Sequence, residues 1–125
     1  MGLTFDTGAL IGLEGRRRGI AQVHERARER GIRIVVPSVV VLEWWRGRTD
    51  VRDALLSSVE IEQLTEELAK LAGVAVAAVR GATNIDAAVM ASAAQRGDTV
   101  YTSDPDDLKK LHAYFSAVKN IVKVE

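Results

Sequence analysis

Four acidic residues stand where their carboxylates could act on one substrate. Asp6 directly follows the apolar stretch LTF, and Asp104 follows VYTS; both stretches have the pattern of short buried strands. Asp86 lies in the first turn of an Ala-rich helical stretch, and Glu43 stands among apolar residues in VVVLEWW. Carboxylates without histidine or cysteine partners suit hard divalent cations such as Mg²⁺ or Mn²⁺. The pattern therefore indicates a site for a hard divalent cation.

The chain lacks the residues that other common catalytic and cofactor-binding sites require. The chain has no cysteine, so it has no thiolate metal site, cysteine nucleophile or disulfide. His24 and His112 are not spaced as metal ligands, and zinc is therefore not expected. The chain also contains no P-loop, no glycine fingerprint for dinucleotides and no G-x-S-x-G elbow.

Two of the acids also have a purely structural explanation. Asp104 precedes Pro105, a combination typical of a helix start, in which the aspartate caps a backbone N–H. Asp106 and Asp107 would then lie in the first turn, where the helix dipole favours anions. Asp6 could cap the helix that follows it in the same way.

The other two acids are harder to explain by helix capping. Asn84 is expected to cap the helix that carries Asp86, so that helix start does not need Asp86 as a cap. Burial of a lone carboxylate at Glu43 would be costly, so we expect it to be paired, protonated or bound to a cation. Arg46, one helical turn further on, is the alternative partner for Glu43.

Strands and helices are expected to alternate along the chain. Short strands are predicted at 3–5, 32–36, 59–64, 99–102 and 120–124. Helices are predicted at 7–15, 20–30, 39–47 with Ser38 as its cap, 51–57, 65–81, 84–97 and 105–115. This order predicts an α/β fold, a three-layer α/β/α sandwich with a central, mainly parallel sheet. Ligands bind outside the carboxyl ends of strands in such sheets, which is where the acids are expected to meet.

Length and charge restrict the function further. The chain of 125 residues is expected to form one domain, residues 1–125, and 17 basic residues balance 17 acidic ones. Residues 1–55 contain ten basic residues, all arginines. They could be a solvated helix face or, together with Lys109 and Lys110, a rim that binds phosphates. No run is long enough to span a membrane and no secretion signal is recognisable, so a cytoplasmic location is expected.

Three stretches resemble the PIN-domain ribonucleases, and in size the VapC toxins of toxin–antitoxin pairs. They are LTFDTGALIGL, VPSVVVLEWWRG and NIDAAVMASAAQRGDTVYTSDPDDL, and the resemblance covers nearly the whole chain. The third stretch is the most specific. It combines an aspartate that opens an Ala-rich helix, a glycine, a short strand, then Thr-Ser-Asp and a further Asp. Leu108, where the family often has an aromatic residue, and the two tryptophans after Glu43 depart from the pattern.

The resemblance implies roles for eight residues. Asp6, Glu43, Asp86 and Asp104 match the family's four acidic positions, which are catalytic and bind metal. Asp107 matches an additional acid, and Thr7 with Thr102 or Ser103 match hydroxyl positions that hold metal-bound water or phosphate.

The same resemblance implies an activity and partners. The expected protein is a Mg²⁺-dependent endoribonuclease, with Mn²⁺ as an alternative ion, that leaves a 5′-phosphate and a 3′-hydroxyl. RNA is its expected substrate, a cognate antitoxin covers its acidic groove, and the toxin forms a homodimer. Two alternatives stay open: a catalytically silent PIN-like scaffold that binds nucleic acid or protein, and a Mg²⁺-dependent phosphatase. The phosphatase is disfavoured because Thr-Gly, and not a second acid, follows Asp6.

Overall fold

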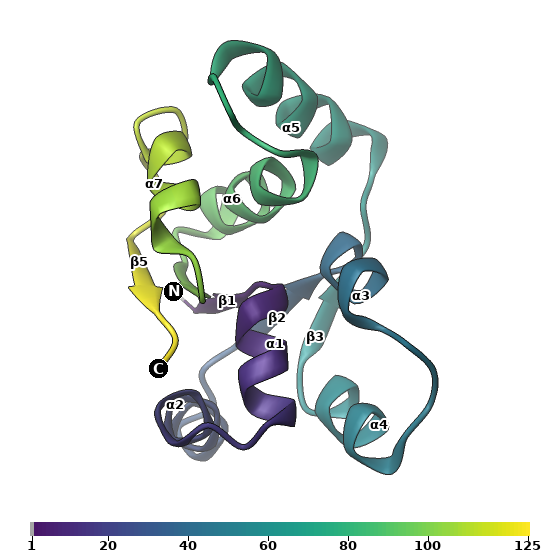
Figure 1. The fold of residues 1–125 in the computed structure, drawn as a ribbon. Coiled ribbons are helices and arrows are strands. Elements are labelled where there is room, and N and C mark those ends of the chain that lie inside the picture. The colour runs from purple at the N-terminus through teal and green to yellow at the C-terminus, as the bar shows by residue number, and fades with distance from the viewer. Residues whose placement is uncertain (1) are drawn as a thin grey trace.

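A five-stranded sheet forms the centre of the protein. The structure, a computed structural model, describes residues 2–125. The strands are β1 (Leu3–Phe5), β2 (Ile34–Pro37), β3 (Glu60–Glu62), β4 (Thr99–Thr102) and β5 (Asn120–Lys123). They are all parallel, in the order β3-β2-β1-β4-β5. The parallel sheet (Figure 1) confirms the prediction, and the pairing of β1 with β4 places the carboxyl ends of these two strands side by side.

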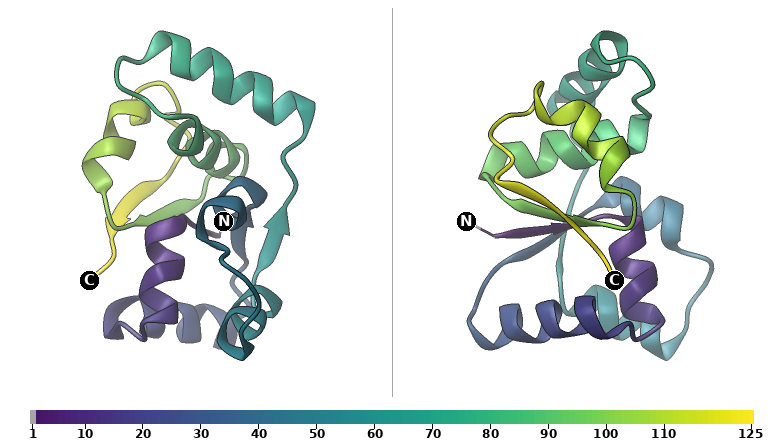
Figure 2. Two further views of the ribbon diagram at one scale, coloured as in Figure 1. Left: turned by 45° about the vertical axis from the view of Figure 1, so that its right-hand side comes forward. Right: turned by 60° about the vertical axis from the view of Figure 1, so that its left-hand side comes forward.

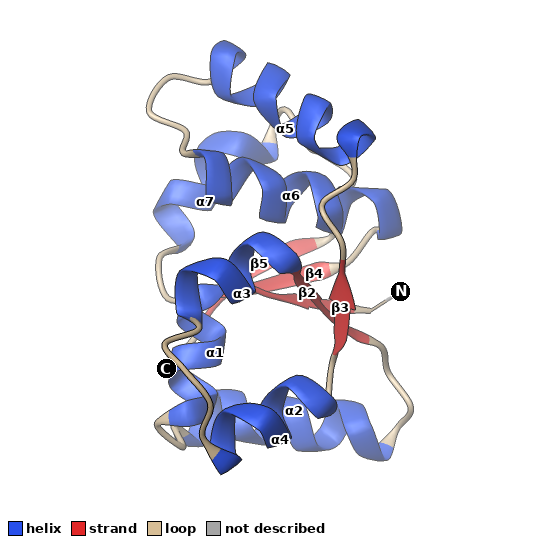
Figure 3. Ribbon diagram, turned by 90° about the vertical axis from the view of Figure 1, so that its right-hand side faces the viewer, coloured by secondary structure: helices blue, strands red, loops and turns tan. Residues whose placement is uncertain are grey.

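Seven helices in the described residues connect the strands. They are α1 (Thr7–Glu14), α2 (Arg18–Glu29), α3 (Ser38–Trp44), α4 (Asp50–Ser57), α5 (Glu66–Ala78), α6 (Asn84–Arg96) and α7 (Pro105–His112). Figure 3 shows α6 and α7 on one face of the sheet, with α5 outside them, and α1, α2 and α4 on the other face. The fold is therefore the predicted three-layer α/β/α sandwich. Among residues 2–125, no helix has both the length and the apolar character needed to cross a membrane.

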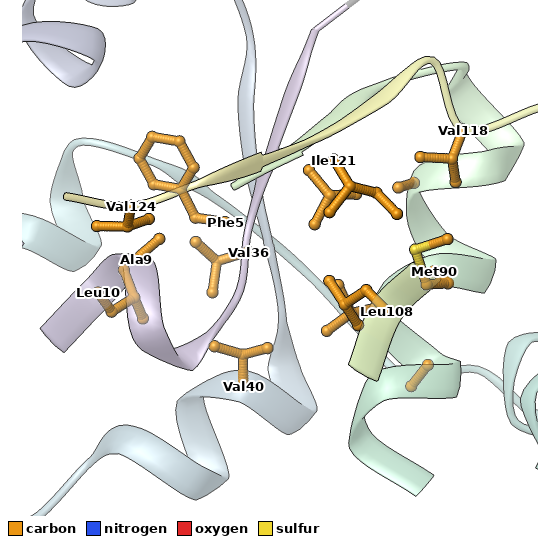
Figure 4. Close-up of a cluster of buried hydrophobic side chains, with 14 of the residues drawn as sticks. Phe5, Ala9, Leu10, Val36, Val40, Met90, Leu108, Val118, Ile121 and Val124 are labelled. Carbon is orange, nitrogen blue, oxygen red and sulfur yellow. The ribbon is translucent and has the colours of Figure 1, made fainter. Parts of the chain in front are cut away.

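Buried apolar side chains fill both sides of the sheet. Figure 4 shows Phe5 beside Ala9 and Leu10 of α1, whereas Met90 of α6 and Leu108 of α7 belong to a second group. All of these side chains are almost completely inaccessible to solvent. The strand side chains alternate between the two faces, so one short strand supplies both halves of the core.

Helix α6 is the most deeply buried helix of the described chain. Every residue from Ala87 to Ala93 is buried, because α6 lies between the sheet and α5, as both views of Figure 2 show. The small alanine side chains allow this close packing on two sides. Asp86 stands one residue before the buried stretch, where α6 emerges at the edge of the sheet.

Two of the predicted helix caps are wrong. Thr83, not Asn84, caps α6, because Thr83 has an extended backbone and its hydroxyl accepts the N–H of Asp86 at 3.2 Å. Ser38 is not the cap of α3, because it already has helical conformation; its hydroxyl accepts the N–H of Leu64 at 3.0 Å. Helix α3 also ends at Trp44, three residues before the expected end.

Candidate active site

The site begins at Asp6, at the carboxyl end of β1. Asp6 is the N-cap residue of α1, and its carboxylate accepts the N–H of Ala9 at 3.1 Å. Its own backbone N–H donates to the carbonyl of Tyr101 in β4 at 3.2 Å. The capping role expected from the sequence is therefore real, and it holds the carboxylate at the junction of the two central strands.

Thr102, at the end of β4, links two of the acids. Its side chain is buried, its hydroxyl is hydrogen-bonded to the carboxylate of Asp6, and it accepts the backbone N–H of Asp104 at 3.0 Å. All three groups therefore have fixed relative positions. The hydroxyl of Thr102 is engaged within the protein, which suits positioning of the acids better than direct contact with a phosphate.

Asp104 occupies the N-cap position of α7, but its side chain does not cap the helix. No capping hydrogen bond forms from its carboxylate, although Pro105 begins the helix as the sequence predicted. The side chain is exposed. A hydrogen bond with Asp107 is the largest cause that raises the pKa of Asp104, and partial desolvation and then the negative charge of Asp107 raise it further. A capping role alone therefore does not account for Asp104, because its carboxylate also interacts with the carboxylate of Asp107.

Asp86 lies within the electrostatic reach of the other acids. Burial raises its pKa first, and the negative charges of Asp107, Glu43 and Asp104 raise it further. Burial likewise raises the pKa of Asp6 to about 6, with the charge of Asp86 acting in the same direction. These mutual effects indicate that acids from four separate segments of the chain face a common region.

Glu43 differs from its prediction in both position and partner. Its side chain is exposed, because the core-facing positions of α3 are Val40 and Trp44. Arg46 does not pair with Glu43; its guanidinium donates to the backbone oxygen of Trp45 at 2.7 Å. The hydroxyl of Thr7 donates a hydrogen bond to the carboxylate of Glu43 instead. The expectation of a buried carboxylate was wrong. The apolar residues on either side of Glu43 did not indicate which face of the helix packs against the core.

Gly8, which the sequence analysis did not single out, allows α1 to pack closely against the loop after β4. A Cβ atom on Gly8 would lie 2.1 Å from Oγ of Ser103 and 2.7 Å from its backbone nitrogen. Only a residue without a side chain allows this approach, which keeps Thr7 and the exposed Ser103 at the same edge. The position of Gly8 directly after Asp6 and Thr7 was the sequence signal that could have predicted this contact.

The donor set fits a hydrated Mg²⁺ ion. The oxygens are carboxylates. Burial is the main cause of the raised pKa values of Asp6 and Asp86, and neighbouring negative charge, which a cation would offset, raises them further. Within residues 2–125, no three acidic or histidine side chains converge closely enough to form a complete ligand cage. Mg²⁺ is usually bound by one or two carboxylates and several waters, so the open arrangement is compatible with it.

Many of the arginines predicted for a phosphate-binding rim lie far from the acids. Arg16 and Arg17 follow the carboxyl end of α1, and α2 continues from there, whereas Asp6 precedes the amino end of α1. Figures 1 and 3 show α2 beyond the far end of α1, away from the edge where β4 meets α7. These arginines therefore do not surround the acids. Lys110 does lie there, with its Nζ 3.3 Å from Oδ1 of Asp107.

Comparison with known proteins agrees with this architecture. A chain of a toxin–antitoxin complex from Klebsiella pneumoniae is similar in fold, with a TM-score of 0.70 and 18% identity; the match covers 98% of this chain and 97% of that one. The Pyrobaculum aerophilum protein PAE2754 is similar with a TM-score of 0.57 and 17% identity, over 94% and 95% of the two chains. A search of curated protein sequences gave no match. The model of the PIN domain matches residues 3–113, nearly the whole described chain, and the protein therefore belongs to the PIN domain family.

Proposed function

We propose that the protein is a Mg²⁺-dependent endoribonuclease of the VapC type, formed by one PIN-like domain over residues 1–125. The observation that carries the proposal is the group of acids at the carboxyl ends of the central strands. Within that group the pKa values of Asp6 and Asp86 are raised by burial and by neighbouring carboxylates. A site with this charge surplus requires a cation before it can accept a phosphodiester. Mn²⁺ is expected to substitute for Mg²⁺.

Four acids would hold the ion: Asp6, Glu43, Asp86 and Asp104. When bound, Mg²⁺ supplies a water of lowered pKa as nucleophile and neutralises charge on the phosphate oxygens. Asp107 contributes further negative charge beside Asp86 and Asp104.

Hydroxyl groups complete the proposed site. Thr102 orients Asp6, and Thr7 orients Glu43 through its hydrogen bond. The exposed hydroxyl of Ser103 is free to donate to a phosphate oxygen or to a water at the same edge. In this reaction no protein side chain acts as the nucleophile, in agreement with the lack of cysteine in the chain.

The proposed biological role is that of the toxin in a toxin–antitoxin pair, acting on RNA in the cytoplasm. The support is the fold shared with a chain of the Klebsiella pneumoniae toxin–antitoxin complex. The proposed partners are a cognate antitoxin and a second copy of this chain. Exposed apolar side chains on α5, such as Leu71 and Val74, are suited to a protein contact. An adjacent reading frame that encodes a small DNA-binding protein would support the pairing.

The activity is tested with purified protein freed of any partner. We expect it to cut RNA with Mg²⁺ or Mn²⁺, and we expect EDTA to stop the reaction. Asp6→Asn, Asp86→Asn and Asp104→Asn should each abolish cutting while far-UV circular dichroism stays unchanged. Asp50→Asn is the matched control, because Asp50 is an exposed acid in the first turn of α4.

The outcomes distinguish the proposal from its alternatives. Full activity of one variant would remove that residue from the site. RNA binding without any cutting would favour the silent scaffold. Release of phosphate from a small phosphomonoester, with intact RNA, would favour the phosphatase.

A further inference from the structure

Most basic side chains of the described chain either form ion pairs with acids outside the candidate site or lie far from the candidate site. Arg33 forms an ion pair with Glu60, and Arg52 forms one with Glu14. Arg96 forms ion pairs with both Glu62 and Asp98. Arg48 pairs with Asp50 and Asp53, and Lys70 pairs with Glu66. None of these carboxylates belongs to the candidate site. The arginines of α2 lie beyond the far end of α1 (Figure 3).

Lys110 is the exception among the ion pairs. Its Nζ lies 3.3 Å from Oδ1 of Asp107, and both side chains are 47% exposed. Asp107 in turn interacts with Asp104 and Asp86. The ammonium group is therefore one contact away from the centre of the candidate site.

The α5–α6 turn approaches the same ammonium group. A Cβ on Gly81 would lie 3.6 Å from Nζ of Lys110, so this turn borders the lysine. Arg80, the residue before this glycine, is exposed in the turn. The ammonium group of Lys110 therefore lies between Asp107 and the turn that leads into α6.

We propose that Lys110 binds a backbone phosphate of the RNA next to the carboxylates and thereby positions the strand. This inference rests on the proposed function, because it names a substrate contact of that same site. An exposed ion pair three residues apart on one helix contributes little to stability, so exchanging Asp107 for a phosphate costs little. The contact is expected to be independent of sequence, since an ammonium group recognises a phosphate as a point charge.

The test measures RNA affinity as a function of salt. A dye-labelled single-stranded RNA is titrated with protein at fixed Mg²⁺ and several KCl concentrations, and fluorescence anisotropy gives the binding constant. All proteins carry Asp6→Asn to prevent cutting. Loss of one phosphate contact should reduce the slope of log K against log salt by about 0.7 for Lys110→Ala. Lys110→Arg should restore the slope.

Two controls separate this contact from a general effect of charge or folding. Lys70→Ala removes another exposed lysine, paired with Glu66 on α5, and should leave the slope unchanged. Melting curves should show that Lys110→Ala folds like the wild type. In the otherwise wild-type chain, Lys110→Ala should raise KM and leave kcat unchanged, since a phosphate contact made equally in ground and transition states contributes uniform binding.

The results separate this inference from the proposed function. If the protein binds and cuts RNA, but Lys110→Ala has the wild-type slope and KM, the inference is overturned and the proposed function stands. A lower kcat with an unchanged slope would also overturn it. If the protein neither binds nor cuts RNA, both proposals fail.

Discussion

Asp6 combines a structural and an electrostatic role in one side chain. Its carboxylate caps α1 through the N–H of Ala9, which stabilises the charged form, yet burial raises its pKa to about 6. Desolvation therefore outweighs the hydrogen bonds. The folded protein holds a carboxylate that is only weakly acidic, and its stability must depend on pH for that reason.

The first prediction concerns this pH dependence. The folded pKa of Asp6, about 6, is higher than its ordinary value of 3.8. Its contribution to stability is therefore fully present below the ordinary pKa and is lost as pH rises through about 6. The loss amounts to at most about 3 kcal/mol. Urea unfolding without metal, measured from pH 4 to 7, should show a steeper fall for wild type than for Asp6→Asn.

The asparagine variant is suited to this comparison because it keeps an oxygen that can cap Ala9. The difference between the two curves therefore reports the charge of Asp6 together with its coupling to Asp86. Parallel curves over this pH range would show that Asp6 has an ordinary pKa in the folded protein.

The second prediction concerns Asp104. Because its hydrogen bond with Asp107 and the charge of that residue raise its pKa, its negative charge strains the metal-free fold at neutral pH. Asp104→Asn should therefore raise the melting temperature in EDTA. Mg²⁺ should stabilise the wild type more than the variant, because an ion bound to the native state adds stability by linkage.

Asp106→Asn is the control for Asp104→Asn. Asp106 lies in the first turn of α7, where the helix dipole stabilises its negative charge. The control substitution should not raise the melting temperature. A lower melting temperature of Asp104→Asn in EDTA, together with no response of either protein to Mg²⁺, would make Asp104 a helix cap after all.

At the level of elements, the contact between α1 and the β4–α7 loop determines how the two halves of the site meet. Gly8 lies in the first turn of α1 against Ser103, with no space for a side chain. The acids and hydroxyls on either side of this contact belong to segments almost a hundred residues apart. Their separation is consequently sensitive to a single methyl group.

The third prediction compares two helical glycines. Gly8→Ala should destabilise the protein and weaken Mg²⁺-dependent cutting, because the added Cβ would overlap Ser103 and push α1 from the loop. Gly73→Ala in α5 meets no atom within 4 Å and should stabilise the protein by about 0.5–1 kcal/mol. Urea unfolding and RNA cutting of both variants provide the measurement. Equal changes in stability would contradict the close contact.

At the level of the whole molecule, Arg96, the last residue of α6, connects this helix to two strands of the sheet, β1 and β3. Its guanidinium contacts Asp98 at 2.9 Å, Glu62 of β3 at 2.6 Å and the hydroxyl of Thr4 in β1 at 3.0 Å. Asp98 is only 1% exposed. The described chain leaves no buried side-chain polar atom without a partner, so this network is fully satisfied.

The fourth prediction tests this network. Arg96→Met should cost about 3–5 kcal/mol, because it leaves the charge of Asp98 buried and unpaired. Arg48→Met removes an exposed partner of Asp53 and should cost less than about 1 kcal/mol. The free energies of unfolding in urea give both values. A similar small cost for the two variants would show that the buried network does not hold the sheet to α6.

The sequence by itself determined the order of the elements and the acids at their ends. Strand and helix periodicity, proline and glycine act over a few residues, so the alternating order and the positions of Asp6, Asp86 and Asp104 could be read from neighbouring letters. The helix starts at Ser38 and Asn84 were misplaced by one residue. Backbone conformation at the junction, and not the residue type alone, decides which side chain caps a helix.

Only the tertiary structure decided which groups meet. The exposure of Glu43 follows from how α3 packs, because Val40 and Trp44 occupy the face that the core accepts. The partners of Arg96 in β1 and β3 are distant in the sequence, and the arginines near α2 lie at the wrong end of α1 to surround the acids. Such relations depend on how whole elements pack, and burial and pairing of a charge arise from that packing. Local sequence patterns therefore could not predict which of these groups become neighbours.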